Sequence, residues 1–291
     1  MYARLLGPLE VEVDGRQIAI GGRAQRALLT RLLLDAGRTV STARLVEDLW
    51  GENAPASAAK MVQIYVSMLR KVLPEGVLVT RSPGYALDLP TDAVDLVRFE
   101  RLRERGRAEL RDGSPARAAG MLREALALWR GSALAEFDEP FAAIESRRLE
   151  EQHLASVEDR IDADLAAGSD SSLIGELEAL VARHPLRERP RSQLMVALYR
   201  AGRQVDALAG YRAFRETLAA ELGIEPSPAL RELENRILQH DPVLEGPRHQ
   251  ARRHVTRPAR AVRQGTVRWS APCPTGHNVP GRRLWRPIPA V

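Results

Sequence analysis

The sequence of 291 residues is long enough for two domains, and its 43 basic and 38 acidic side chains give a formal net charge of +5. Residues 246–291 hold ten Arg and no Lys, Asp or Glu, so the preceding 245 residues carry 33 basic and 38 acidic side chains. A nucleic-acid partner must therefore be argued from local surfaces. A single cysteine, Cys273, excludes an internal disulfide framework, and no run of about 18 apolar residues predicts a membrane span, so we expect a cytoplasmic protein.

Residues 1–93 are predicted to mix short strands with three helices and to form the first domain. Ser41 or Thr42 can cap the second helix and Ser57 the third. Strands, three helices and a final hairpin around 82–84 follow the order of a winged helix. The expected elements are a β-rich start over Leu5–Val13, a strand at Gln17–Ile20, helices at Ala27–Ala36, Ala43–Trp50 and Ala58–Leu73, and strands at Val77–Thr80 and Tyr85–Leu89.

Residues 94–245 are predicted to be wholly helical, because they are rich in Ala, Leu, Glu and Arg and contain no β-branched run. Gly168 and Gly202 lie 34 residues apart, each after a helix and before another amphipathic segment. This is the period of tetratricopeptide repeats. An earlier unit around Gly113 is displaced by an insertion of about 21 residues, which we assign to 129–146. The predicted fold class is therefore mainly α: a winged helix followed by an all-α helical repeat domain.

The third predicted helix has one polar face, which could enter a DNA major groove. Arg and Gln can hydrogen-bond base edges, whereas Lys mostly neutralises phosphate. The alternative is an ordinary amphipathic helix whose polar face is merely wet. The polar stripe contains Lys60, Gln63, Ser67, Arg70 and Lys71, and the opposite, apolar side contains Val62, Tyr65, Val66, Leu69, Val72 and Leu73. Ile64 lies near the polar stripe, where it could contact a thymine methyl group.

The predicted hairpin supplies one further cation. Arg81 stands beside Ser82-Pro83-Gly84, where a wing could carry it into the adjacent minor groove. The alternative is a solvated arginine at a hairpin tip.

Several segments of the chain resemble those of a known family. Val62–Leu73 and Thr80–Tyr85 resemble the recognition helix and wing of OmpR-type winged helices. Four later segments resemble the bacterial transcriptional activation domain: Ala125–Gly131, Pro185–Arg189, Ala197–Arg203 and Glu221–Leu230. The two domains in this order, over about residues 2–240, resemble the SARP family, the antibiotic-pathway regulatory proteins of actinobacteria. The resemblance divides the chain into a DNA-binding domain (1–93), an activation domain (94–245) and a tail (246–291).

The SARP resemblance implies a function and partners. It implies an activator of an antibiotic or specialised-metabolite gene cluster that binds direct repeats in double-stranded promoter DNA near the −35 element. It further implies recruitment of RNA polymerase holoenzyme through its sigma factor, a homo-oligomer on the DNA and a nucleoid-associated, cytoplasmic location with no membrane partner. Two alternatives stay open: a helical-repeat adaptor that binds proteins, and a ligand-gated repressor whose repeat groove is the sensor.

The resemblance also assigns site residues. It places Gln63, Ser67, Met68 and Arg70 in the groove, Lys71 at the phosphate-facing end of the helix and Arg81 at the minor-groove position of the wing. Ser41, Thr42 and Arg44 fall where phosphates are bound, at a helix N-terminus that favours anions. Met68 departs from the family, which often has Arg there, so one contact is expected to be missing. The segment matching the polymerase-contact loop is Gly51, Glu52, Asn53, Ala54, Pro55 and Ala56.

Other candidate sites have weaker support in the sequence. Nucleophile-elbow, zinc-protease and phosphate-loop motifs are missing, so we expect neither enzymatic activity nor a cofactor. Cys273 and His277, with His249 and His254, fit no structural zinc spacing. We expect the acidic run at 158–164 to be a solvated helix face, although a metal or partner site is the alternative. Residues 246–291 are expected to be disordered, either without a role or as a non-specific DNA tether. Four aromatic residues, expected mainly as repeat core and alternatively as groove lining, are Trp129, Tyr199, Tyr211 and Phe214.

Overall fold

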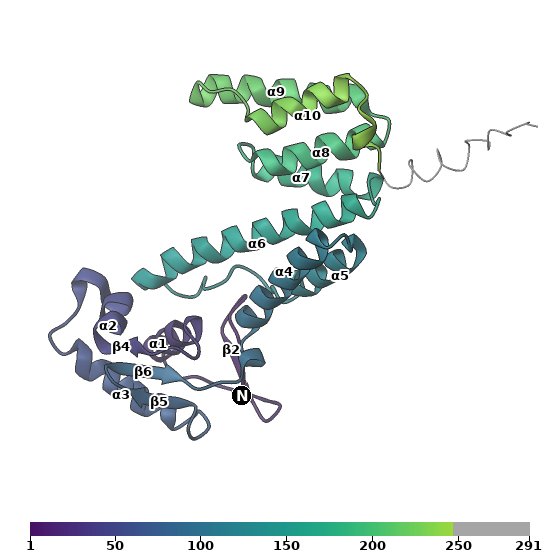
Figure 1. Cartoon of the computed structure of the whole chain (residues 1–291). Helices are drawn as coiled ribbons and strands as arrows, with labels where there is room; N and C mark the ends of the chain where they lie inside the picture. Colours follow the sequence, from purple (N-terminus) through teal and green to yellow (C-terminus); the bar gives the residue numbers. More distant parts are fainter. Residues whose placement is uncertain (247–291) are drawn as a thin grey trace, which may run out of the picture.

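The computed structural model describes residues 1–246, in which a winged-helix end and a stack of helices are joined by one long helix, α6 (Figure 1). At the winged-helix end, three strands form an antiparallel sheet in the order β1-β2-β3, and three more form a second sheet in the order β4-β6-β5. The strands and α-helices of this end are β1 (Tyr2–Arg4), β2 (Glu10–Val13), β3 (Arg16–Ile18), α1 (Arg23–Leu34), β4 (Val40–Ser41), α2 (Thr42–Trp50), α3 (Ala58–Arg70), β5 (Leu78–Arg81) and β6 (Gly84–Leu87).

The hairpin β5–β6 is held against the start of α2 by the short strand β4. Val40 pairs with Tyr85 and Ser41 with Gly84, while Arg81 pairs with Gly84 on the other side. A Cβ atom on Gly84 would lie 1.9 Å from the carbonyl oxygen of Val40. Only glycine allows this approach of the two backbones, and it fixes the wing beside α2.

The helices of the second part confirm the predicted all-α repeat architecture. The glycines from which the period was inferred both adopt a positive φ directly after a helix, 85° at Gly168 and 77° at Gly202. Glycine is common at this position because it adopts the left-handed conformation without a steric cost. The helices are α4 (Asp95–Arg111), α5 (Pro115–Leu126), α6 (Pro140–Ala166), α7 (Ile174–Arg183), α8 (Glu188–Arg200), α9 (Gln204–Leu222) and α10 (Pro228–Leu238).

The first hydrophobic core continues past residue 93. The buried carboxylate of Asp95 accepts hydrogen bonds from the backbone N–H groups of Leu5, at 2.7 Å, and Leu6, at 3.1 Å. The segment predicted as an insertion packs into the same core through Phe137 and Phe141. A second core begins on α6 at Ile161 and extends to the last described turn. Helix α6, 27 residues long, therefore belongs to both cores.

Several predicted boundaries are corrected by the structure. Helix α1 begins at Arg23, four residues before the predicted start, and α3 ends at Arg70 rather than Leu73. Ser41 caps α2 by accepting a hydrogen bond from the Arg44 N–H at 3.1 Å, but Ser57 makes no side-chain capping bond to α3. Val72 was predicted on the buried side and is instead 42% exposed, because the chain leaves the helix before reaching it.

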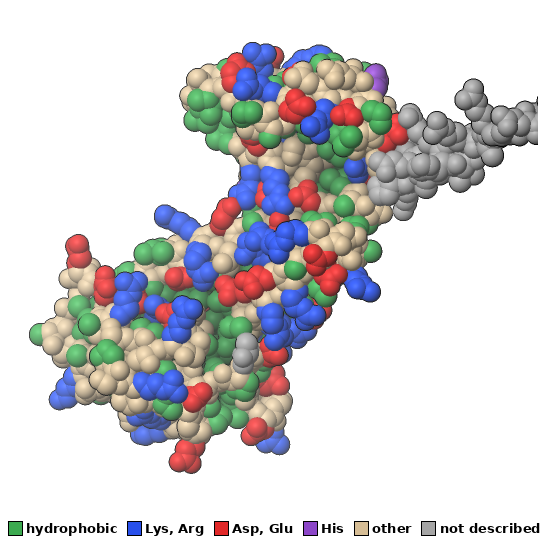
Figure 2. Space-filling view, viewed as in Figure 1, with side chains coloured by type: hydrophobic (Ala, Val, Ile, Leu, Met, Phe, Trp, Pro, Cys, Tyr) green, Lys and Arg blue, Asp and Glu red, His purple; other side chains and the backbone are tan. Residues whose placement is uncertain are grey.

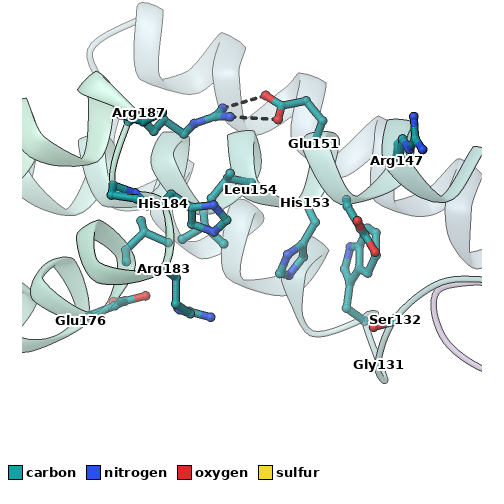
Figure 3. Close-up of a pocket in the computed structure, with 16 residues that line it drawn as sticks. Gly131, Ser132, Arg147, Glu151, His153, Leu154, Glu176, Arg183, His184 and Arg187 are labelled. Atoms are coloured by element: carbon teal, nitrogen blue, oxygen red, sulfur yellow. Dashed lines mark hydrogen bonds and ion pairs between the residues drawn. The ribbon is translucent and has the colours of Figure 1, made fainter. Parts of the chain in front are cut away.

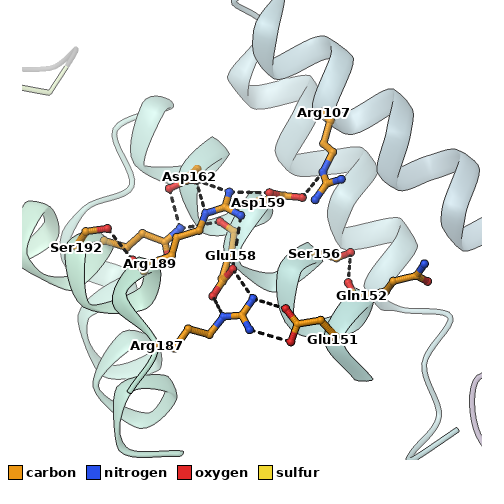
Figure 4. Close-up of polar contacts among 11 residues, drawn as sticks. Arg107, Glu151, Gln152, Ser156, Glu158, Asp159, Asp162, Arg187, Arg189 and Ser192 are labelled. Carbon is orange, nitrogen blue, oxygen red and sulfur yellow. Dashed lines mark hydrogen bonds and ion pairs between the residues drawn. The ribbon is translucent and has the colours of Figure 1, made fainter. Parts of the chain in front are cut away.

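The acidic run of α6 is buried, which corrects the prediction of a solvated face. Glu158 is 1% and Asp159 5% exposed. Arginines enclose them: Arg189 reaches Asp159 and Asp162, each at 2.6 Å, and Arg187 pairs with Glu158 (Figure 4). Burial of these carboxylates is tolerated because each has a charged hydrogen-bond partner. The part of the chain that the structure describes contains no group of three or more potential metal ligands.

The predicted aromatic core is confirmed for Tyr211 and Phe214, which are 3% and 0% exposed. Tyr199 packs partly buried against the same core. Trp129 packs against the first core instead and borders a groove. None of the helices within residues 1–246 is both long and apolar enough to cross a lipid bilayer. The predicted disorder of the tail and the zinc alternative at Cys273 and His277 lie outside the described residues.

Candidate nucleic-acid interface

Helix α3 exposes the polar stripe that the sequence predicted. Lys60, Gln63, Ser67 and Lys71 are all exposed, while Val62, Val66 and Leu69 on the opposite side are at most 2% exposed. Neither lysine has a carboxylate within 4.0 Å among the described residues. Figure 2 shows several basic side chains over the part of the surface that α3 and the wing occupy. This face can therefore offer amide, hydroxyl and ammonium donors to an outside partner.

Arg70 connects α3 to the wing. Its Nε donates to the carbonyl oxygen of Leu78 at 3.0 Å, and its Nη2 donates to the Thr80 Oγ1 at 2.7 Å. Both acceptors belong to β5. Arg70 was predicted among the groove-facing residues, but in this structure its guanidinium ties α3 to strand β5 of the wing.

An apolar stripe runs along α3 beside the polar one. Ile64 and Met68 are 44% and 42% exposed and lie four residues apart on one face of the helix, and Val72, 42% exposed, follows in the turn after its last residue. The Met68 Sδ accepts a hydrogen bond from the Gln25 Nε2 at 3.1 Å, so α1 supports this edge of the surface. Ile64 and Met68 were both predicted near the groove. Val72 was missed because it was assigned to the core, and Gln25 because nothing in the sequence relates it to α3.

The wing and the start of α2 form one continuous edge. Thr42 donates through its backbone N–H and its Oγ1 to the carbonyl oxygen of Pro83, at 3.2 and 3.4 Å. Arg81 is exposed and its Nη2 lies 3.3 Å from an Asp88 carboxylate oxygen. Arg44 pairs with Glu47 and with the buried Asp48. The structure thus brings Ser41, Thr42 and Arg81 to one side, while Arg44 already has two acidic partners.

The predicted polymerase-contact loop connects α2 to α3. Gly51, Glu52 and Asn53 form a short 3-10 turn, and the residues from Glu52 to Ala56 are exposed. A Cβ atom on Gly51 would lie 3.2 Å from the Cγ of Pro140, the first residue of α6. The loop therefore abuts the start of the long helix.

Comparison with known proteins identifies both parts of the chain. Residues 16–87 match the family described as "Transcriptional regulatory protein, C terminal", and residues 94–238 match the "Bacterial transcriptional activator domain". The regulatory protein DnrI of Streptomyces peucetius is 37% identical over 257 residues, covering 84% of this chain and 94% of DnrI. The chain belongs to the SARP family of transcriptional regulators.

Other SARP-like relatives are longer than this chain. The regulatory protein AfsR of Streptomyces coelicolor is 47% identical over 82% of this chain but only 24% of AfsR, so the chain spans about a quarter of that relative. A solved structure of Mycobacterium tuberculosis EmbR, in complex with a low affinity phosphopeptide, is 38% identical with a TM-score of 0.79. The match covers 83% of this chain and 65% of the EmbR chain. The fold predicted for this SARP family member, a winged helix followed by an all-α domain, is thereby confirmed.

Proposed function

We propose that this chain is a sequence-specific DNA-binding activator of an antibiotic or specialised-metabolite gene cluster. One observation carries the proposal: α3 exposes Lys60, Gln63, Ser67 and Lys71 while its opposite side is buried, and Arg70 ties that helix to an exposed wing. Membership of a family of transcriptional regulators supports it.

In the proposed complex α3 lies in the major groove. Gln63 contacts a base edge, because an amide can donate and accept at adenine in a bidentate pair. Lys60 and Lys71 neutralise phosphates on the two sides of the groove. Arg81 enters the adjacent minor groove, and Ser41 with Thr42 faces a phosphate at the start of α2. The position of the wing relative to α3 is set by Arg70.

The proposed partners of the bound protein are a second copy and RNA polymerase. Binding to direct repeats places two copies in the same orientation along the promoter, near the −35 element. The exposed loop from Glu52 to Ala56 then offers a contact to the holoenzyme, including its sigma factor. We keep the domain division proposed from the sequence, in which residues 1–93 form the DNA-binding domain and residues 94–245 form the activation domain.

The test is binding of the full chain to duplexes from upstream of neighbouring genes and to scrambled duplexes, at two salt concentrations. Specific binding should survive moderate salt. Arg81→Ala should weaken binding to every duplex. Gln63→Ala should instead reduce the difference in binding free energy between specific and scrambled duplexes by ~1–3 kcal/mol. Arg212→Ala, an exposed arginine on α9, is the control. Equal, salt-sensitive binding to every duplex would instead favour the protein-binding adaptor, and unchanged binding in both variants would overturn the docking face.

A further inference from the structure

A groove of about 1220 Å³ lies where the two hydrophobic cores meet (Figure 3). Its walls come from the loop at 129–132, from one face of α6, and from the end of α7 with the turn before α8. Trp129 in this lining packs against the first core, whereas Leu154 and Val157 pack against the second. A molecule in the groove would therefore touch both halves of the protein at once.

The groove has an aromatic wall. The rings of Trp129 and His153 have their centroids 4.5 Å apart, and Phe99 supports Trp129 from its edge at 5.5 Å. Leu180 adds an apolar contact from α7, and Leu186 at the turn is 43% exposed. The indole Nε1–H of Trp129 is buried and has no acceptor within the described chain. An aromatic or planar ligand fits such a wall.

The charges next to this wall favour an anion. Arg183 lines the groove and has no carboxylate partner among residues 1–246, since its Nε donates only to the carbonyl oxygen of Ala179 at 3.4 Å. Two of the acids in the lining are already occupied, Glu151 by Arg187 at 2.8 Å and Glu176 by Arg160. Glu150, the third, accepts a hydrogen bond from the Ser146 hydroxyl at 3.4 Å. Burial and the charge of Arg183 lower the pKa of His153.

We propose that this groove is a binding site for an aromatic small molecule with an anionic group, such as a carboxylate. The ring lies against Trp129 and His153, and the anion accepts charge-assisted hydrogen bonds from Arg183. Binding there fixes the α7–α8 end relative to the winged helix. The ligand site stands without reference to DNA, and only its use as an effector site rests on the proposed function.

The test uses three probes on the full chain, measured by isothermal titration calorimetry: 2-naphthoate, its neutral isostere 2-naphthamide, and the non-aromatic anion cyclohexanecarboxylate. We expect 2-naphthoate to bind at least about fivefold more tightly than either of the others, because only it satisfies both the wall and Arg183. Failure of 2-naphthoate to bind at millimolar concentration, or equal affinities for 2-naphthoate and 2-naphthamide, would overturn the proposal.

Matched variants locate the site. Arg183→Gln should bring the affinities of 2-naphthoate and 2-naphthamide together, and His153→Leu should weaken both. Arg212→Gln, at an exposed arginine on α9 that does not line the groove, should preserve the preference. A preference unchanged in Arg183→Gln would contradict the assigned anion contact. A separate titration with DNA, with and without 2-naphthoate, tests the effector role, and its failure leaves the binding site intact.

Discussion

On α3, Lys60 and Lys71 stand exposed with no carboxylate near them in the described structure, whereas on α6 the acids Glu158, Asp159 and Asp164 are buried among arginines. Both helices show charged residues at helical spacing, and the sequence predicted both sets of charges to be exposed. In the structure, the two sets differ in whether the charged side chains have oppositely charged partners within the described chain. The acids of α6 pair with arginines where the two halves of the protein meet, whereas Lys60 and Lys71 stay available to an outside partner.

The largest effect should follow from removing a buried acid. Asp164 pairs with Arg160 at 2.9 Å and also with Arg123, and Asp164→Ala leaves the guanidinium of Arg160 buried with Glu176 alone. We expect a loss of ~3–5 kcal/mol in the free energy of unfolding, measured by urea denaturation. Glu178→Ala, at an exposed acid on α7, should change it by less than about 0.5 kcal/mol. A small loss at Asp164 would mean that α6 does not depend on its ion pairs.

Removing a free cation should affect DNA binding and leave stability unchanged. Lys60→Gln and Lys71→Gln should each weaken binding to specific and scrambled duplexes alike, because a phosphate contact carries no sequence information. The slope of log K against log salt should fall in magnitude by about 1 per lysine. Fluorescence anisotropy over a salt series measures it. An unchanged slope would remove that lysine from the interface.

A smaller effect should come from the apolar stripe on α3. If Ile64 packs on a thymine methyl, Ile64→Ala should lose about 0.8 kcal/mol of affinity for a specific duplex. Replacing the contacted thymine by uracil should cost the wild type a similar amount and cost Ile64→Ala nothing further. Equal losses on the uracil substitution in both proteins would show that Ile64 does not contact the methyl group.

The smallest effect concerns pH. Burial lowers the pKa of His153 below its ordinary 6.5, so the folded protein binds fewer protons than the unfolded chain just below that pH. Its contribution to stability is therefore complete above pH 6.5 and is lost as the pH falls from 6.5 through the lowered pKa. Thermal unfolding of His153→Phe between pH 7 and 5 should decline less steeply than that of the wild type. Parallel curves would show that His153 is not the group responsible.

Local signals were sufficient to predict most of the fold. Glycines after helices, the 34-residue period and the hairpin at 82–84 are properties of neighbouring residues, and the structure confirms the architecture built on them. The short strand β4 was missed because two residues carry no periodicity. The role of Phe137 and Phe141 in the first core was missed for another reason: it depends on a contact between segments more than 90 residues apart. Their four-residue spacing was the available signal.

The candidate site was predicted in outline only. Exposure of Lys60, Gln63 and Ser67 follows from helical periodicity, so the sequence sufficed for them. Whether an exposed arginine is free depends on what the fold places beside it. Arg70 meets Thr80 across the wing, and Arg44 meets Asp48 on its own helix, and neither pairing could be ranked against a phosphate contact before the structure was known.

Helix α6 also has a mechanical consequence. Its 27 residues measure about 40 Å, and its two ends are embedded in different cores. A rod of that length converts a tilt of about 10° at one end into a displacement of about 7 Å at the other, roughly two base-pair steps along a DNA duplex. In the proposed DNA complex, the length of this one helix therefore sets how far the distal repeats reach from the winged helix, and hence which promoter spacings two copies could share.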